Sequence, residues 1–217
     1  MSRQNRGGEE EKMSEDHQKN FRRIPIKAHQ FLADVPLHSF DFIELKGGRK
    51  GMQMDEIYRI TGLNQAEEYE LNFITKSLFW LRGQIGKVLG WDDVPEMINK
   101  HSWITHLTAK EREKSLIPSG KVESINTILY CYKNEILFEI INRTVHCFWV
   151  LASEEKADGY DLYVAIYVKK INWRTPIYMT LVSPMLKWII YPSIKKSIQR
   201  NWEKTFPLRT VGTQVMV

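Results

Sequence analysis

The chain has 217 residues with 43% hydrophobic and 12% aromatic content, and its formal net charge is +5 at pH 7. This length favours one domain with a sizeable core, and the aromatic content suits a large apolar interior or an aromatic-lined pocket. We expect no secretory signal, because no apolar core follows the first basic residues, and therefore a cytoplasmic location. A membrane-spanning helix is not expected either, since Pro184, Lys187 and Pro192 interrupt the most apolar stretch, 175–194.

The two ends of the chain are predicted to lack packed structure. Residues 1–20 are rich in Gly, Glu, Lys and Arg and have almost no apolar side chains, which is typical of a disordered leader. Residues 207–217 are expected to form a flexible tail. The sequence between them, 21–206, is predicted to fold as a single domain.

The domain is predicted to begin with one strand and to continue with helices. Apolar and polar residues alternate from His38 to Leu45, which predicts a first strand that ends at Gly47. Apolar residues at helical spacing then predict helices over 52–60 and 67–89. Residues 92–120 show no clear pattern.

From Val122 onward the apolar period changes to two, which indicates strands. The predicted strands are 122–132, 135–140, 144–151 and 160–170, with a turn at Lys133–Asn134 and a charged loop over 153–159. Short connections favour an antiparallel order. Cys131 and Cys147 fall within these strands, and in a reducing compartment we expect both to be buried free thiols.

A long helical segment is predicted at the C-terminal end, over 177–206. Apolar residues recur there at three- or four-residue steps, and Pro184 and Pro192 predict two or three pieces or a kinked rod. Between Lys169 and Arg209 the sequence has nine Lys or Arg and one acidic residue, Glu203. These cations either solvate the outer face of a helix or attract an anionic ligand, an acidic lipid surface or nucleic-acid phosphates.

Both faces of the last two predicted strands are apolar or aromatic. One face is therefore expected to be covered by the C-terminal helix. The other needs a second cover, for which the candidates are the helix predicted over 67–89 and a second copy of the chain in a homodimer.

Several short motifs are similar to those of one known superfamily. They are Asn134–Phe138, Val168–Lys170, Asn172–Trp173, Thr175–Tyr178, Ser183–Pro184 and Ile189–Pro192, with Leu81–Trp91 upstream. The chain resembles START-like (SRPBCC, Bet v 1-like) helix-grip domains, and more specifically an uncharacterised bacterial family often fused behind an NAD(P)-binding epimerase-like domain. The resemblance implies an α+β fold in which an antiparallel sheet grips a long C-terminal helix, with a helical insert after the first strand. The five predicted strands are fewer than is usual in that superfamily, and Lys187 stands where a histidine is expected.

The resemblance also implies a function, which is the non-catalytic binding of a hydrophobic or amphipathic small molecule between sheet and helix, with no cofactor. Aromatic side chains are the candidates for the wall of that cavity, and a cation at its mouth suits an anionic group of the ligand. The candidate wall residues are Trp149, Tyr163, Tyr167, Tyr178 and Trp188, and the candidate cations are Lys187 and Arg82. For each aromatic residue taken singly, ordinary core packing is the competing interpretation.

Two other classes of function stay open. A cyclase- or lyase-like enzyme acting on such a ligand needs a general acid or base, and the polar candidates on the predicted strand faces are His146 and Glu139, whose partners the sequence does not reveal. A peripheral protein is the second class, in which the basic helix contacts an anionic membrane surface. Nucleic acid ranks last among the partners, since no base-reading element is evident.

Overall fold

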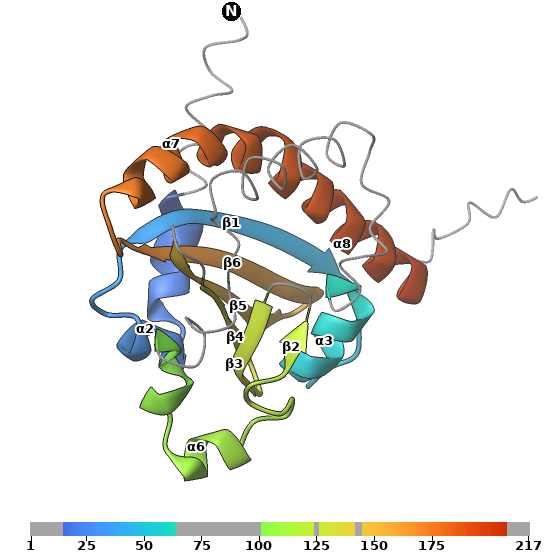
Figure 1. Cartoon of the computed structure of the whole chain (residues 1–217). Helices are drawn as coiled ribbons and strands as arrows, with labels where there is room; N and C mark the ends of the chain where they lie inside the picture. The colour runs from blue at the N-terminus through green and yellow to red at the C-terminus, as the bar shows by residue number, and fades with distance from the viewer. Residues whose placement is uncertain (1–14, 64–100, 124–125, 142–144, 208–217) are drawn as a thin grey trace, which may run out of the picture.

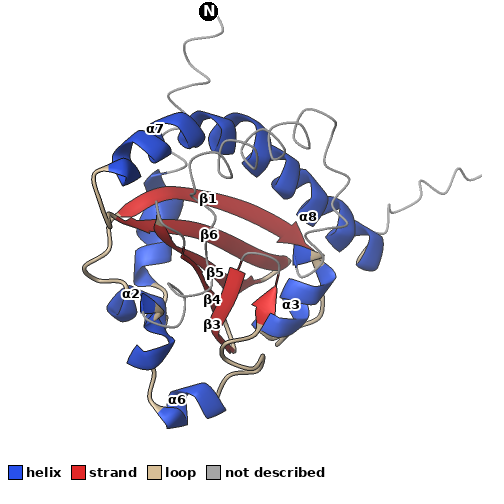
Figure 2. Cartoon of the chain, viewed as in Figure 1, coloured by secondary structure: helices blue, strands red, loops and turns tan. Residues whose placement is uncertain are grey.

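The computed structural model describes residues 15–63, 101–123, 126–141 and 145–207. Across its centre runs an antiparallel sheet with the spatial order β1-β6-β5-β4-β3-β2 (Figures 1 and 2). The predicted α+β class and antiparallel order are confirmed, and the described part of the chain forms six strands where the sequence predicted five. The strands are β1 (Leu37–Lys46), β2 (Val122–Glu123), β3 (Asn126–Tyr132), β4 (Glu135–Ile141), β5 (His146–Lys156) and β6 (Gly159–Lys169).

The hairpin between β5 and β6 is longer than the sequence predicted. The charged loop expected over 153–159 is wrong, because β5 continues to Lys156, which pairs with Gly159 at the start of β6. The charged residues, which predicted a loop, are accommodated within the strand. The Lys156 ammonium forms an ion pair of 2.7 Å with Glu154 two residues earlier on β5. Glycine is needed at 159, where a Cβ atom would lie 2.0 Å from the carbonyl oxygen of Leu45 on β1.

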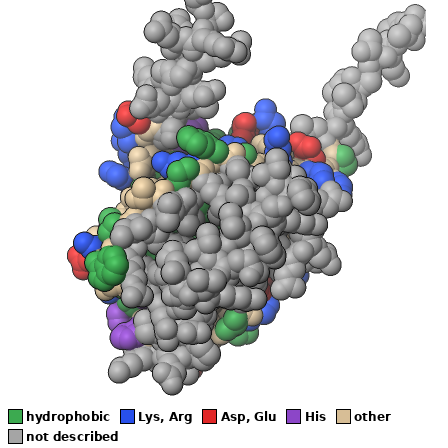
Figure 3. All heavy atoms as spheres, turned by 45° about the horizontal axis from the view of Figure 1, so that its top comes forward, with side chains coloured by type: hydrophobic (Ala, Val, Ile, Leu, Met, Phe, Trp, Pro, Cys, Tyr) green, Lys and Arg blue, Asp and Glu red, His purple; other side chains and the backbone are tan. Residues whose placement is uncertain are grey.

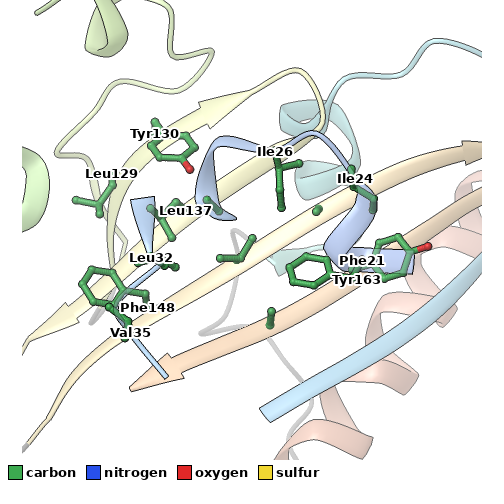
Figure 4. Close-up of a cluster of buried hydrophobic side chains, with 14 of the residues drawn as sticks. Phe21, Ile24, Ile26, Leu32, Val35, Leu129, Tyr130, Leu137, Phe148 and Tyr163 are labelled. Carbon is green, nitrogen blue, oxygen red and sulfur yellow. The ribbon is translucent and has the colours of Figure 1, made fainter. Parts of the chain in front are cut away.

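The N-terminal segment covers one face of the sheet (Figure 4). Residues 15–23 are helical, and α2 (Lys27–Phe31) follows. The 3-10 helix η2 (Trp103–His106) continues this layer, and α6 (Ala109–Glu113) adjoins α2 through an ion pair between Lys27 and Glu111. The buried side chains that meet on this face include Phe21, Ile24, Ile26, Leu32, Val35, Tyr130, Leu137, Phe148 and Tyr163.

This cover differs from the one that the sequence predicted. Residues 15–20, part of the segment 1–20 that was assigned to a disordered leader, are helical, and the helix expected over 67–89 lies outside the described residues. Phe21 explains the difference, because its ring packs at 5.5 Å from that of Phe40 and 5.8 Å from that of Tyr163. The described residues 15–20 are thus held next to the sheet by the aromatic side chain that follows them.

The opposite face of the sheet carries α3 (Met54–Ile60) and the C-terminal helix α8 (Tyr191–Thr205). Ile198 and Trp202 of α8 are fully buried in one cluster with Ile43 and Leu162 of the sheet. The Trp202 indole Nε1 also donates a hydrogen bond of 2.9 Å to the carbonyl oxygen of Lys46. The prediction that the last helix packs on one face of the sheet is confirmed.

The C-terminal segment is helical throughout but not uniform. It consists of α7 (Arg174–Met185), a π-helix η3 (Leu186–Ile190) and α8, and it arches over β1 (Figure 1). A proline in a helix clashes with the carbonyl group four residues earlier, which for Pro192 belongs to Trp188. The π-turn widens the helix at that place, so the predicted break in the rod is found there.

Candidate functional site

A narrow crevice lies between the sheet and the first turns of α8. Its apolar walls come from β1, β5, β6, α8 and Leu63, and its volume is about 30 Å³, on the scale of one water molecule. The space predicted between sheet and helix is therefore nearly filled by side chains. The apolar lining includes Trp149, Leu151, Val164, Ile166, Ile194 and Ile198.

Packing along this crevice is uneven. Trp149, Val164 and Ile194 stay partly exposed, although they lie between the sheet and a helix. One helical turn further on, Ile198 is fully buried. Since protein interiors are normally close-packed, the start of α8 is the loosely packed part of this interface.

Polar groups gather at one end of the crevice. The Lys195 ammonium donates to the carbonyl oxygen of Phe42 at 2.7 Å and to the Asp41 carboxylate at 3.3 Å. The Ser39 hydroxyl donates to the phenol oxygen of Tyr191 at 3.5 Å. Burial raises the pKa of Tyr191 to about 12, so its phenol stays a hydrogen-bond donor at neutral pH. The crevice thus has an apolar body and a polar end.

The structure separates the predicted wall residues. Trp149 lines the crevice, whereas Tyr163 and Tyr167 lie on the opposite face of the sheet, against the cluster that the N-terminal segment covers. Strand geometry explains this separation. Trp149 is paired with Ile166, and side chains an odd number of residues away from Ile166 point to the other face of β6.

Lys187 and Trp188 also lie away from the crevice. Lys187 is exposed, and 79% of the Trp188 surface is accessible to solvent. A π-turn has more residues per turn than an α-helix, so η3 shifts the apolar stripe of the segment and turns Trp188 outward. The side chain of Tyr178 and the whole of Arg82 lie outside the described residues.

Four residues of α8 that lie at the crevice were not among the predicted site residues. Tyr191, Ile194 and Ile198 line the crevice, and Lys195 lies at its polar end. The signal for the first three was present in the sequence, because they belong to the apolar stripe of the last helix. Lys195 carried no such signal, since it was one of many cations in that segment.

The two polar residues considered for catalysis contact each other in the interior. His146 Nε2 lies 2.7 Å from Glu139 Oε1, and the backbone N–H of Trp103 donates to the same oxygen at 2.9 Å. The Ser102 hydroxyl donates to the second oxygen of this carboxylate. The Trp103 ring covers the pair, with its centre 5.9 Å from that of His146. This buried carboxylate holds η2 onto the sheet.

A second buried glutamate on the same strand has a similar role. Glu135 accepts hydrogen bonds from the backbone N–H groups of Lys27 at 2.6 Å and Ala28 at 3.0 Å, and from the Tyr130 hydroxyl at 3.1 Å. Burial raises the pKa of this carboxyl, although each of these hydrogen bonds opposes the rise. β4 therefore holds both α2 and η2 through one carboxylate each.

The sequence of residues 32–193 matches the family described as "Protein of unknown function (DUF2867)". The chain belongs to this family. No curated protein and no solved structure matches the sequence of this chain. The DUF2867 match runs from the end of the N-terminal segment through the described strands to Ser193. It thus includes the sheet wall of the crevice but ends before Ile194 and Ile198.

A wider hollow, of about 610 Å³, lies at another edge of this DUF2867 protein. Its walls include Arg23 from the first helix, Lys133 from the β3–β4 turn and Lys156 at the end of β5. Several of its polar groups are engaged with one another or with nearby backbone, such as Lys156 with Glu154 at 2.7 Å. The Tyr160 hydroxyl likewise donates to the carbonyl oxygen of Arg49 at 2.6 Å. Because one wall belongs to the N-terminal helix, sequence reasoning could not foresee this hollow.

Proposed function

We propose that this DUF2867 protein binds a hydrophobic or amphipathic small molecule between the sheet and α8, as START-like helix-grip domains do. Membership of that superfamily is part of the proposal, and the antiparallel sheet with a packed C-terminal helix supports it. The main support is the partial exposure of Trp149, Val164 and Ile194 inside the sheet–helix interface. Covering apolar surface with a ligand contributes about 25 cal/mol per Å².

A ligand of ordinary size requires the crevice to open. Cavities that hold drug-sized ligands measure roughly 300–1,000 Å³, far more than the 30 Å³ between sheet and helix. Ile198 and Trp202 are buried at the far end, so the start of α8 is the part that moves. The π-turn immediately before Tyr191 supplies a hinge, since such turns interrupt the regular hydrogen bonding of a helix.

The two ends of α8 are anchored with different strength. At the start, the ion pair between Lys195 and Asp41 has both side chains 38% exposed, and such pairs contribute about 0–1 kcal/mol. At the far end, loss of a buried tryptophan such as Trp202 costs about 3–5 kcal/mol. Opening the start of the helix therefore takes little free energy compared with detaching its end.

The polar end of the crevice fits the head group of an amphipathic ligand. Opening the helix would separate Lys195 from Asp41, and the ammonium would then be available to a carboxylate or phosphate of the ligand. Tyr191 would donate a second hydrogen bond, because its raised pKa keeps the phenol protonated. The apolar part of the ligand would lie on Trp149 and Ile194.

Titration with a long-chain fatty acid and with a hydrophobic dye tests this function. Trp149→Ala is expected to weaken binding at least about tenfold, because it removes the largest apolar surface of the crevice. Two matched controls are expected to bind as the unchanged protein does, Trp188→Ala on the outer surface and Tyr163→Phe on the opposite face of the sheet. Failure of both probes to bind, or equal binding by the Trp149 variant, would reject the proposal.

A further inference from the structure

The outward side of α7 and η3 carries large apolar side chains. Trp173 is 70% exposed and Trp188 is 79% exposed, and Pro176, Thr180 and Pro184 lie exposed between them. These residues follow one another at three- or four-residue steps, so they share one side of the segment. We call Trp173, Pro176, Thr180, Pro184, Lys187 and Trp188 the outer stripe. Figure 3 shows hydrophobic and basic side chains beside one another on this part of the surface.

This stripe departs from the usual pattern of a surface helix, whose outward side is charged or polar. α7 has no charged residue after Arg174. Two of its polar side chains serve the interior, since Thr175 is buried and Ser183 lies 3.0 Å from His38 Nε2 on β1. Among the described side chains of this segment, those that face solvent are the two prolines, Thr180, Lys187 and the two tryptophans.

Basic residues surround the stripe without acidic neighbours on the same segment. No Asp or Glu occurs between Asp161 and Glu203. Lys195 is excluded from the outer charge, because it turns inward to Asp41. The exposed cations are Lys170, Lys187, Lys196, Arg200 and Lys204.

We propose that the outer stripe docks onto a membrane surface that contains anionic lipids. Tryptophan side chains favour the level of the lipid head groups, and nearby Lys and Arg are attracted to anionic lipids. Trp188 follows Trp173 by 15 positions, which corresponds to about 22 Å along a helix axis. α7 and η3 would thus lie in the plane of the surface with a tryptophan at each end.

The segment lies on such a surface and does not cross it. Within the described part of the chain, no helix has the length and apolarity that crossing a bilayer requires. Single-stranded nucleic acid is the competing partner, because bases also stack on aromatic rings within a basic surface. Two tryptophans about 22 Å apart, with prolines between them, suit a flat apolar interface better than a continuous row of stacked bases.

Co-sedimentation of the full chain with vesicles tests the proposal. The vesicles are phosphatidylcholine alone and phosphatidylcholine mixed with phosphatidylserine, each at low and high salt. Binding is expected only with phosphatidylserine and is expected to fall with salt, since exposed charges are screened over about 10 Å at 0.1 M. Trp173→Ala with Trp188→Ala is expected to abolish it. Lys187→Gln and Lys196→Gln are each expected to weaken it about fivefold.

Matched controls come from α6 and the residues just after it, and α6 lies at the opposite end of the molecule from α7 (Figure 1). Lys110→Gln and Leu116→Ala, both at exposed positions, are expected to bind vesicles as the unchanged protein does. An unchanged unfolding temperature for every variant shows that the fold is retained. No binding to phosphatidylserine vesicles at low salt, or equal losses in the Lys110 and Leu116 controls, overturns the proposal. The proposal is also overturned if the protein binds a single-stranded RNA tightly, loses that binding in the double Trp variant and does not bind vesicles.

Discussion

His146 and Glu139 form a buried pair in which Nε2 and Oε1 are 2.7 Å apart and the two side chains are 4% and 1% exposed. The same carboxylate also accepts hydrogen bonds from Ser102 and from the backbone of Trp103. Its removal would leave three donors without their acceptor, two of them on buried side chains. Such groups carry a desolvation cost that no new contact offsets.

Glu139→Ala is therefore expected to lower the free energy of unfolding by about 3–5 kcal/mol. Urea denaturation measures this loss. The matched control is Glu113→Ala at an exposed position of α6, with an expected change within about 0.5 kcal/mol. A loss of less than about 1 kcal/mol for the Glu139 variant would show that the carboxylate does not hold η2 in place.

Because α8 is anchored more firmly at its end than at its start, substitutions along the helix are expected to lower the stability by unequal amounts. Trp202→Ala is expected to cost about 3–5 kcal/mol of stability, because the ring is buried and leaves a cavity. Ile194→Ala is expected to cost about 1 kcal/mol, since this side chain remains partly exposed. Urea denaturation of both variants provides the comparison. Equal losses would mean that the start of α8 is packed as firmly as its end.

His38 predicts a dependence of stability on pH. Burial, followed by the positive charge of Lys187, lowers the pKa of His38 below its ordinary value of 6.5. The folded protein then binds this proton less readily than the unfolded chain does, so His38 contributes its full stability above pH 6.5. That contribution is lost as the pH falls from 6.5 through the lowered pKa.

Titration of the His38 ring protons by NMR measures this pKa directly. Lys187→Gln is expected to move the pKa back towards 6.5 without reaching it, because burial is the larger cause. Lys196→Gln, at another exposed position of the same segment, is the control. A pKa at or above 6.5 in the unchanged protein would contradict the prediction.

Gly159 predicts a steric effect at the junction of β6 and β1. Gly159→Ala is expected to cost about 3 kcal/mol or more, because its Cβ atom would meet the carbonyl oxygen of Leu45. Gly51→Ala is the comparison, since that position has open space around it but a φ of +72°. Its expected loss is about 1 kcal/mol from backbone strain alone. Thermal unfolding of the two variants separates the steric effect from the strain, and equal losses would reject the close approach.

The sequence predicted the parts of the fold that depend on local periodicity. The alternation predicted that β3 to β6 are strands, although β5 extends further than expected. Residue parity within a strand also decides the face, and it places Trp149 and Tyr163 on opposite faces although both were assigned to one wall. The apolar stripe of the last helix likewise predicted that Ile198 and Trp202 face the sheet. Each of these patterns depends only on residues that lie within a few positions of one another in the chain.

The rest depended on contacts between distant residues. Trp188 was assigned to the crevice because its spacing to Tyr191 assumes a regular α-helix, whereas a π-turn lies between them. The contact between Glu139 and His146 depends on the register of two strands, and no pattern in either strand reveals it. The docking of Phe21 similarly depends on rings of β1 and β6.

The hydrogen bond between the Lys27 amide and Glu135 spans 108 positions of the chain. During synthesis the N-terminal segment therefore leaves the ribosome long before the strand that holds it exists. Phe21 and Leu32 have no sheet to cover until β4, β5 and β6 have been made. These apolar residues of the N-terminal segment thus wait for their partners during synthesis, and in the interval their exposed surface is a target for a chaperone that binds nascent chains.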